Sequence, residues 1–121
     1  MKKVLLVDDD TNFRRSLALS LESEGYVIHE AESGVDALEF LNSRHKKEND
    51  SIDCVVLDAR MPGLDGFWLA DQIRSIHESL RIIILSAFPY PEDYDRYLTL
   101  TKPVRLSVLK EAVEGQGVFA E

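Results

Sequence analysis

The sequence predicts an α/β protein in which helices cover both faces of a parallel sheet. Short segments that are apolar throughout recur along the chain, as expected for strands that are buried on both faces. Between them lie longer segments whose apolar residues stand three and four positions apart, the spacing of a helix that packs on one side. Because the two patterns alternate, a layered α/β sandwich fits better than an all-helical or an all-β protein.

Five strands and four helices can be placed from these patterns. The expected strands are residues 3–7, 26–29, 52–57, 81–85 and about 98–100, and the expected helices are residues 11–24, 34–43, 67–76 and 104–113. Asp10 and Ser33 stand where their side chains can cap the first two helices. Gly25 is placed to end the first helix. Residues 61–66 contain Pro and Gly and are expected to form a turn.

The size and charge of the chain restrict its class. With 121 residues we expect one domain over 1–121, with a core from about 3 to 114 and a short tail over 115–121. The net charge of −8 argues against direct binding of nucleic acid, which needs a basic surface. Cys54 is the single cysteine and fits a reducing compartment. No apolar run approaches the ~20 residues of a membrane span, so we expect a cytoplasmic protein without a membrane partner.

Polar residues follow the expected strands at the edge where parallel α/β sheets bind ligands, which is the carboxyl edge. The residues in these places are Asp8, Asp9 and Asp10 after the first strand, Asp58 after the third, Ser86 after the fourth, and Thr101 and Lys102 after the fifth. Acidic, hydroxyl and ammonium groups should therefore meet at one edge of the sheet. Asp10 is more simply explained as a helix cap than as a ligand.

Magnesium and a phosphoryl group are the ligands that this set of residues favours. Mg²⁺ takes oxygen ligands from carboxylates, which Asp9 and Asp58 could supply, with Asp8 acting directly or through water. Ser86 and Lys102 offer the hydrogen-bond donor and the positive charge that a phosphoryl group needs. The Asp58 carboxylate is a plausible nucleophile, because carboxylates form aspartyl phosphates.

Four motifs in order resemble the receiver domain of response regulators in two-component systems. They are Val7-Asp8-Asp9, the segment Asp58-Ala59-Arg60-Met61-Pro62-Gly63-Leu64-Asp65-Gly66, then Leu85-Ser86-Ala87, and finally Lys102-Pro103. The resemblance extends from Lys3 to about Val113. It implies a flavodoxin-like three-layer sandwich with a five-stranded parallel sheet in the order 2-1-3-4-5, as in the chemotaxis regulators of this family.

The resemblance also implies a role for each matching residue. Asp58 would be the phosphoacceptor, and Ser86 and Lys102 would bind the phosphoryl group. Mg²⁺ would be held by Asp8, Asp9, Asp58 and the backbone carbonyl of Arg60. The Lys102–Pro103 peptide bond would be cis, which turns the lysine toward the site.

The function implied is that of a phosphorylation-dependent switch. A sensor histidine kinase or a phosphotransfer protein would supply the phosphoryl group, and the domain would then change its conformation or its partners. It would catalyse only its own phosphorylation and dephosphorylation, so it would not be an enzyme with a separate substrate. A downstream effector protein, a C-terminal effector domain beyond this chain and a homodimer all stay open as partners.

Two other functions are alternatives to the switch. A receiver-fold interaction module that acts without phosphorylation is favoured by an unusual segment between Ser86 and Lys102, and opposed by the full set of site residues. A flavin-binding protein of similar fold needs a hydroxyl- or Gly-rich phosphate loop after the first strand. The three aspartates found there would repel a phosphate in the absence of a metal.

The segment between Ser86 and Lys102 departs from the family pattern. Pro89 and Pro91 leave only residues 92–96 free to form a helix, so we predict that the fourth helix of the family is shortened, irregular or missing. Thr99 stands where the family has an aromatic residue that follows the phosphorylation signal, and Tyr94 and Tyr97 are the nearest aromatic candidates. The usual readout of the signal is therefore in question.

Overall fold

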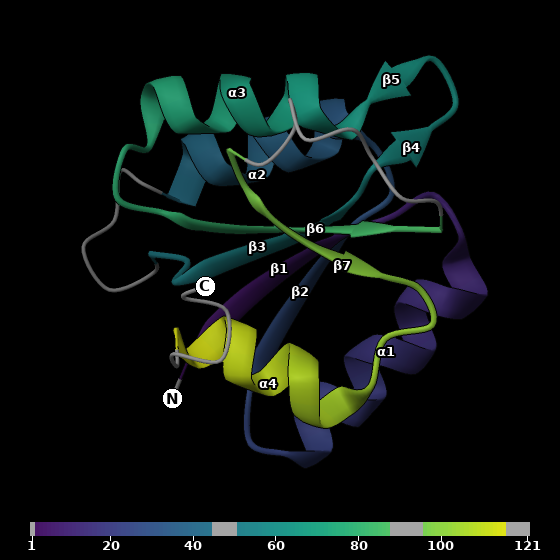
Figure 1. Ribbon diagram of the computed structural model, residues 1–121. Coiled ribbons are helices and arrows are strands. Elements are labelled where there is room, and N and C mark those ends of the chain that lie inside the picture. The colour runs from purple at the N-terminus through teal and green to yellow at the C-terminus, as the bar shows by residue number, and fades with distance from the viewer. Residues whose placement is uncertain (1, 45–50, 88–95, 116–121) are drawn as a thin grey trace.

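A parallel five-stranded sheet forms the centre of the computed structural model, which describes residues 2–44, 51–87 and 96–115. Its strands are β1 (Lys3–Val7), β2 (Val27–Ala31), β3 (Cys54–Asp58), β6 (Arg81–Ser86) and β7 (Leu98–Thr101). They lie side by side in the order β2-β1-β3-β6-β7 (Figure 1). Counted as the first to fifth strands of the sheet, this is the predicted order 2-1-3-4-5, which is thereby confirmed.

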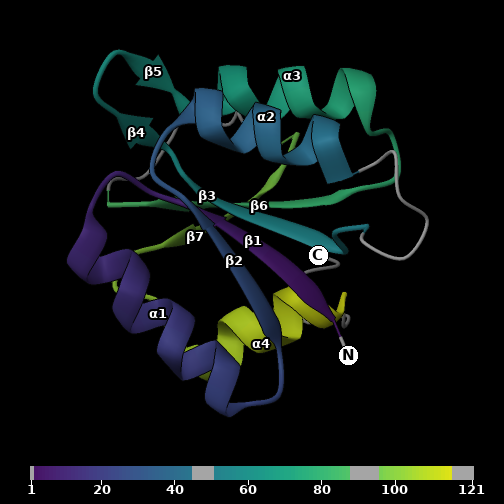
Figure 2. The ribbon, with the colours of Figure 1, turned by 180° about the vertical axis from the view of Figure 1, so that it is seen from behind.

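Two layers of helices cover the sheet, as predicted for a three-layer sandwich. The helices of the described residues are α1 (Thr11–Ser23), α2 (Gly34–Arg44), α3 (Gly66–Ile76) and α4 (Leu106–Glu114). Helices α2 and α3 lie on one face of the sheet and α1 and α4 lie on the other (Figures 1 and 2). Each layer encloses its own apolar core, because successive side chains of a strand point to opposite faces.

The alternation of strand residues between the two cores explains why the strands are apolar throughout. Leu5, Val55 and Ile84 belong to the core under α2 and α3. Leu6 and Val56, each next along its strand, belong to the core under α1 and α4. A strand that is buried on both faces has apolar residues at successive positions and no alternation of polar and apolar residues. The strands are therefore apolar throughout, as the sequence predicted.

Helix caps confirm two local predictions. The Asp10 side chain accepts a hydrogen bond from the N–H of Phe13 at 3.1 Å, and the Ser33 hydroxyl accepts one from Asp36 at 3.1 Å. Helix α1 ends at Ser23, two residues before Gly25, whose φ of 98° suits glycine. The last helix begins at Leu106 rather than at 104, because Arg105 is in an extended conformation.

A short hairpin between β3 and α3 was not predicted. Residues 61–66 were expected to form a turn, but β4 (Arg60–Met61) and β5 (Leu64–Asp65) pair in an antiparallel manner, with Met61 opposite Leu64. Gly63 takes a φ of 71° between the two strands. The predicted turn is therefore confirmed at the centre of the segment. The pairing of β4 with β5 was not predicted, because strands of two residues are too short to show a periodic pattern.

The predicted irregular segment lies largely outside the described residues, which omit 88–95, so the shortened or missing fourth helix stays a prediction. The described part resumes at Arg96 and enters β7 at Leu98. Within the described ranges, none of the helices has the length and apolarity needed to cross a membrane.

Candidate functional site

Three carboxylates meet at the carboxyl edge of the sheet. Asp8 and Asp9 follow β1 directly, and Asp58 is the last residue of β3. One oxygen from each of the three lies within 4.8 Å of the others. Asp8 is buried, Asp58 is partly buried and Asp9 is exposed. The group therefore spans from the interior of the edge to solvent.

The register of the sheet explains this meeting. Strands β1 and β3 are neighbours, with Val7 opposite Leu57. The next residue on each strand is an aspartate, so Asp8 and Asp58 are brought together across the pair. The residues are fifty positions apart in the chain, and parallel pairing alone makes them adjacent.

Lys102 reaches the same carboxylates from the end of β7. Its Nζ lies 3.2 Å from Oδ2 of Asp8 and 3.3 Å from Oδ1 of Asp58. The ammonium group also lies 4.3 Å from the ring centroid of Phe13, within range of a cation–π contact. The Lys102–Pro103 bond is cis, as predicted.

Ser86 and Arg60 stand beside the carboxylates in different ways. Ser86 ends β6, is 2% exposed and lies opposite Thr101 in the register. Its backbone carbonyl accepts a hydrogen bond from the N–H of Lys102 at 2.7 Å. Arg60 begins β4 with an exposed side chain, and its backbone N–H donates to the Asp58 carboxylate. All six predicted site positions thus lie at this edge.

The Asp58 carboxyl holds its proton more tightly than an ordinary aspartate. Burial is the largest cause of its raised pKa, and the charge of Asp8 is the second. The Lys102 ammonium and the Arg60 N–H act in the opposite direction without reversing the shift. The site is therefore short of positive charge, and a cation that entered it would relieve the repulsion.

The donor set fits Mg²⁺. This ion prefers hard oxygen ligands and commonly binds to one or two carboxylates together with water and phosphate oxygens. The three carboxylates offer such ligands at close range. Asp10 serves a different purpose, because its side chain caps α1 while its backbone N–H donates to Oδ1 of Asp8 at 2.9 Å.

Comparison with known proteins agrees with this geometry. The family model described as the response regulator receiver domain matches residues 4–114, which is most of the chain. The chain belongs to the receiver-domain family. Receiver domains are signalling domains of two-component systems and are not classical enzymes.

Curated relatives carry the receiver domain as part of longer proteins. The sensor histidine kinase RcsC of Escherichia coli K12 is 38% identical over 91% of this chain, and the chain spans 12% of that protein. The response regulator MprA of Mycobacterium ulcerans is 42% identical over 70% of this chain, which spans 34% of MprA. The chain therefore spans only 12% and 34% of the lengths of these two relatives.

Solved receiver domains have the same fold. The response regulator TrrA of Thermotoga maritima, solved in complex with Mg²⁺-BeF, aligns with a TM-score of 0.81 and 33% identity. The alignment covers 95% of this chain and 98% of that one. A structure of TrrA in complex with the histidine kinase ThkA aligns with a TM-score of 0.77 and 34% identity, over 95% of this chain and 97% of the matched chain.

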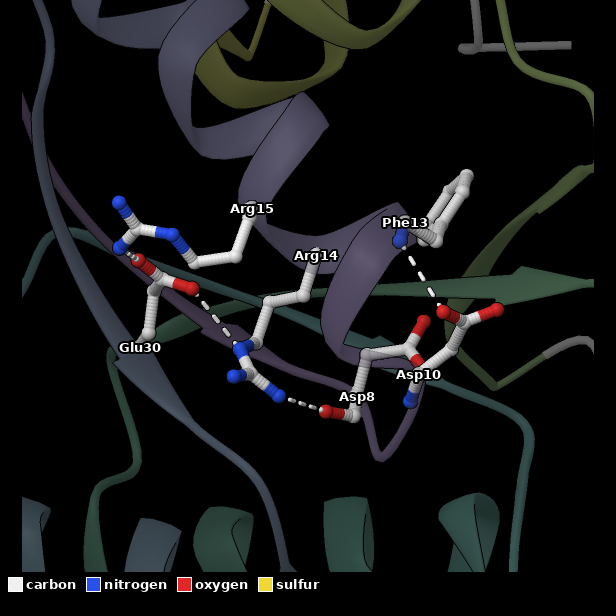
Figure 3. Close-up of polar contacts among 6 residues, drawn as sticks. All are labelled: Asp8, Asp10, Phe13, Arg14, Arg15 and Glu30. Atoms are coloured by element: carbon white, nitrogen blue, oxygen red, sulfur yellow. Dashed lines mark hydrogen bonds and ion pairs between the residues drawn. The ribbon is translucent and has the colours of Figure 1, made fainter.

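A buried arginine next to the site was not foreseen from the sequence of this receiver domain. Arg14, on α1, donates to the backbone carbonyl of Asp8 at 2.6 Å and to Glu30 at 2.8 Å, and Arg15 donates to the other Glu30 oxygen at 2.7 Å (Figure 3). A signal for it exists in the sequence. Arg14 continues the apolar face of Ala18 and Leu21 by one more turn, and an arginine in such a position calls for a buried partner.

The predicted readout residues are only partly described. Tyr97 is half-buried, and its hydroxyl donates to Asp71 on α3 at 2.5 Å. Arg96 forms an ion pair with the same carboxylate at 3.1 Å. Thr99 is half-buried on β7, and its hydroxyl donates to the carbonyl of Tyr97. Tyr94 lies outside the described residues.

Proposed function

We propose that this receiver domain is a phosphorylation-dependent switch that accepts a phosphoryl group on Asp58. The observation that supports it most directly is the placement of Lys102 between Asp8 and Asp58, at 3.2 and 3.3 Å. A purely structural lysine would need one carboxylate partner, and here one cation serves two carboxylates that a third approaches closely. Such a site is prepared for further cationic and phosphoryl ligands.

Magnesium is the cofactor in this proposal. Asp8, Asp9, Asp58 and the backbone carbonyl of Arg60 would hold the ion. When bound, Mg²⁺ would neutralise charge on the carboxylates and on the phosphoryl oxygens. Its binding would be coupled to the protonation of Asp58, because the raised pKa of this carboxyl means that a proton and a cation compete for it.

Asp58, Lys102 and Ser86 have different roles in the proposed phosphoryl transfer. The Asp58 carboxylate forms a bond to phosphorus while the bond from phosphorus to the donor, a phosphohistidine nitrogen or an acyl phosphate oxygen, breaks. Lys102 would pair with the phosphoryl oxygens, and the Ser86 hydroxyl would donate to them. Water later attacks the phosphorus, which releases inorganic phosphate and restores the carboxylate. The domain catalyses this cycle on itself and has no separate substrate.

The partners follow from the same proposal. A sensor histidine kinase or a phosphotransfer protein supplies the phosphoryl group, and a downstream effector protein or effector domain receives the signal. The acidic balance of the chain, at −8, opposes direct binding of nucleic acid. In this proposal the domain acts in the cytoplasm, and residues 1–121 form one domain. A homodimer is a further possible arrangement, which a measurement of the molecular mass in solution would detect.

Phosphorylation by a small donor tests the proposal. Wild-type protein is incubated with acetyl phosphate and Mg²⁺, and intact mass is measured. We expect a gain of one phosphoryl group that requires Mg²⁺ and is lost in Asp58→Asn. Glu39→Gln, which changes an exposed carboxylate on α2, serves as the matched control and should be modified like wild type.

Beryllofluoride provides a second measurement that does not depend on the donor. Its addition with Mg²⁺ should change the fluorescence of Trp68, the only tryptophan, or the amide spectrum of wild type but not of Asp58→Asn. A wild type that gains no mass and shows no spectral change would contradict the switch and favour an interaction module that works without phosphorylation.

A further inference from the structure

Arg14 occupies an unusual place for a charged residue. It lies in the part of α1 that packs on the sheet, beside the buried Ala18 and Leu21, and it is 8% exposed. A guanidinium group is costly to bury unless its donors are satisfied. Its partners therefore indicate what the fold gains from it.

The two partners of Arg14 lie at the ends of two different strands. Its Nη1 donates to the Asp8 carbonyl at 2.6 Å and its Nε donates to Oε1 of Glu30 at 2.8 Å. Glu30 is on β2 and Asp8 follows β1, so one rigid fork connects α1 to the ends of both strands (Figure 3). An arginine can hold such a fixed geometry because its donors are coplanar.

The backbone carbonyl that accepts the hydrogen bond from Arg14 is that of Asp8, whose carboxylate is the most buried of the three at the site. The strand pairings of β1 end at Val7, and the next residue, Asp8, leaves the sheet. The Asp8 N–H still donates to Ala31, at 3.1 Å, and Arg14 fixes the other side of the same residue. The direction in which the chain continues to Asp9 is thus set by this contact.

We propose that Arg14 is a positioning residue for the Mg²⁺ site, acting through the backbone of Asp8 and oriented in turn by Glu30. This inference rests on the proposed function and adds a residue to it. By fixing the Asp8 carbonyl, Arg14 holds the Asp8 and Asp9 carboxylates at the separation from Asp58 that a small cation requires. Outer contacts of this kind set the affinity of metal sites because Mg²⁺ tolerates little departure from its geometry.

Calorimetric titration with MgCl₂ tests this inference. Arg14→Met retains the apolar stem and removes both donors, and it should raise the Kd for Mg²⁺ about tenfold. The matched control is Arg15→Met. Arg15 contacts the same Glu30, at 2.7 Å, but from an exposed position on the far side of Glu30 from Asp8 (Figure 3). Its Kd should stay within about twofold of wild type.

Urea unfolding in EDTA, measured on the same proteins, separates positioning from general stabilisation. A purely structural role would lower the stability of Arg14→Met and leave the Kd of its folded form unchanged, which would overturn the inference. An equal loss of affinity in both variants would also overturn it, because the effect would then reflect net charge alone.

A second variant covers the case in which Arg14→Met does not fold. Arg14→Lys retains the charge but cannot reproduce the planar fork, so its Kd should rise about threefold or more. A Kd equal to that of wild type in Arg14→Lys would overturn the inference. If wild type itself binds no Mg²⁺, the proposed function fails together with this inference, whereas tight binding by wild type and by every variant removes only the role of Arg14.

Discussion

Individual residues at the carboxyl edge combine opposing electrostatic effects. Asp58 is held at a raised pKa by burial and by Asp8, although Lys102 lies 3.3 Å away. Residues selected for stability alone would not place two carboxylates so close to one another. The close approach of Asp8 and Asp58 therefore lowers stability, a cost that the proposed binding of a cation would explain.

Replacing Asp58 with asparagine should stabilise the metal-free protein. Asp58→Asn keeps the shape of the side chain and removes a charge that burial and Asp8 disfavour. We expect the free energy of unfolding in EDTA at pH 7 to rise by on the order of 1 kcal/mol. Urea denaturation followed by circular dichroism measures it, with Glu39→Gln as the control for a lost surface charge. A destabilised Asp58→Asn would show that the Lys102 attraction outweighs the repulsion.

The pH dependence of stability has a definite sign at this residue. Because the folded-state pKa of Asp58 lies above its ordinary value of 3.8, the folded state binds the proton more tightly than the unfolded state does. The contribution of this group to stability therefore falls as the pH rises from 3.8 through the folded-state pKa. In metal-free buffer the difference between Asp58→Asn and wild type should grow over this interval and then level off.

Secondary-structure elements determine where the site residues stand. Helix α1 begins at Thr11, and its cap, Asp10, directly follows Asp8 and Asp9. Helix α3 begins at Gly66, against the backbone of Asp58 and Ala59. Both helix starts are thus fitted to the edge that carries the carboxylates, and changes there should affect the elements and the site differently.

Removing the cap of α1 should lower stability and leave the proposed Mg²⁺ site intact. Asp10→Ala loses the hydrogen bond from Phe13 but keeps its own N–H, which donates to Asp8. We expect a loss of about 1 kcal/mol in the free energy of unfolding, and a Kd for Mg²⁺ within about threefold of wild type. Asp10→Ser, which restores a cap, should recover most of the stability. A large loss of Mg²⁺ affinity in both variants would instead make Asp10 a ligand.

The start of α3 should tolerate no side chain at Gly66. A Cβ atom there would overlap the backbone carbonyl oxygen of Asp58, which cannot move without shifting β3. Gly66→Ala should therefore lower the free energy of unfolding by about 2 kcal/mol and slow phosphorylation. Gly34→Ala is a matched control at the first residue of α2, where the Cβ would overlap only the flexible end of the Leu64 side chain and would make an ordinary contact with Leu69. Equal losses in the two variants would contradict this explanation.

The whole molecule is organised around a sheet with two separate cores. Cys54, on the central strand β3, is fully buried in the core under α1 and α4. Burial is the main cause that raises the pKa of its thiol to about 12 from an ordinary 9.0. Its reactivity therefore reports on the opening of the entire fold.

Thiol labelling should follow global unfolding. At pH 8 the native protein should react with a disulfide reagent on the order of 100-fold more slowly than the urea-unfolded chain, since the reactive thiolate is scarce and shielded. Added Mg²⁺ should slow labelling further if it binds only the folded state. The free energy of unfolding should also fall as the pH rises from 9 toward 12, because the thiol of the unfolded chain ionises at a lower pH than the buried thiol of the folded protein. Cys54→Ala should lack this pH-dependent contribution. Rapid labelling of the native protein would contradict the burial of Cys54.

The sequence alone determined the fold class and most of the site. Strands that are buried on both faces can be predicted because every residue of such a strand contacts a core and is therefore apolar. Asp8, Asp58 and Lys102 can be predicted as site residues because they lie at the ends of those apolar runs. Elements that are long and periodic were therefore predicted within a few residues. The hairpin β4–β5 was not, since two-residue strands have no period.

Only the tertiary structure decided which side chains touch. Arg14 and Glu30 are sixteen residues apart, and nothing in their spacing shows that α1 lies against the end of β2. Lys102 could have paired with either aspartate, and the positions of β7, β3 and β1 at one edge let it reach both. The physical reason is that local patterns report burial and periodicity, whereas the distance between charges depends on how strands are ordered and how helices pack on them.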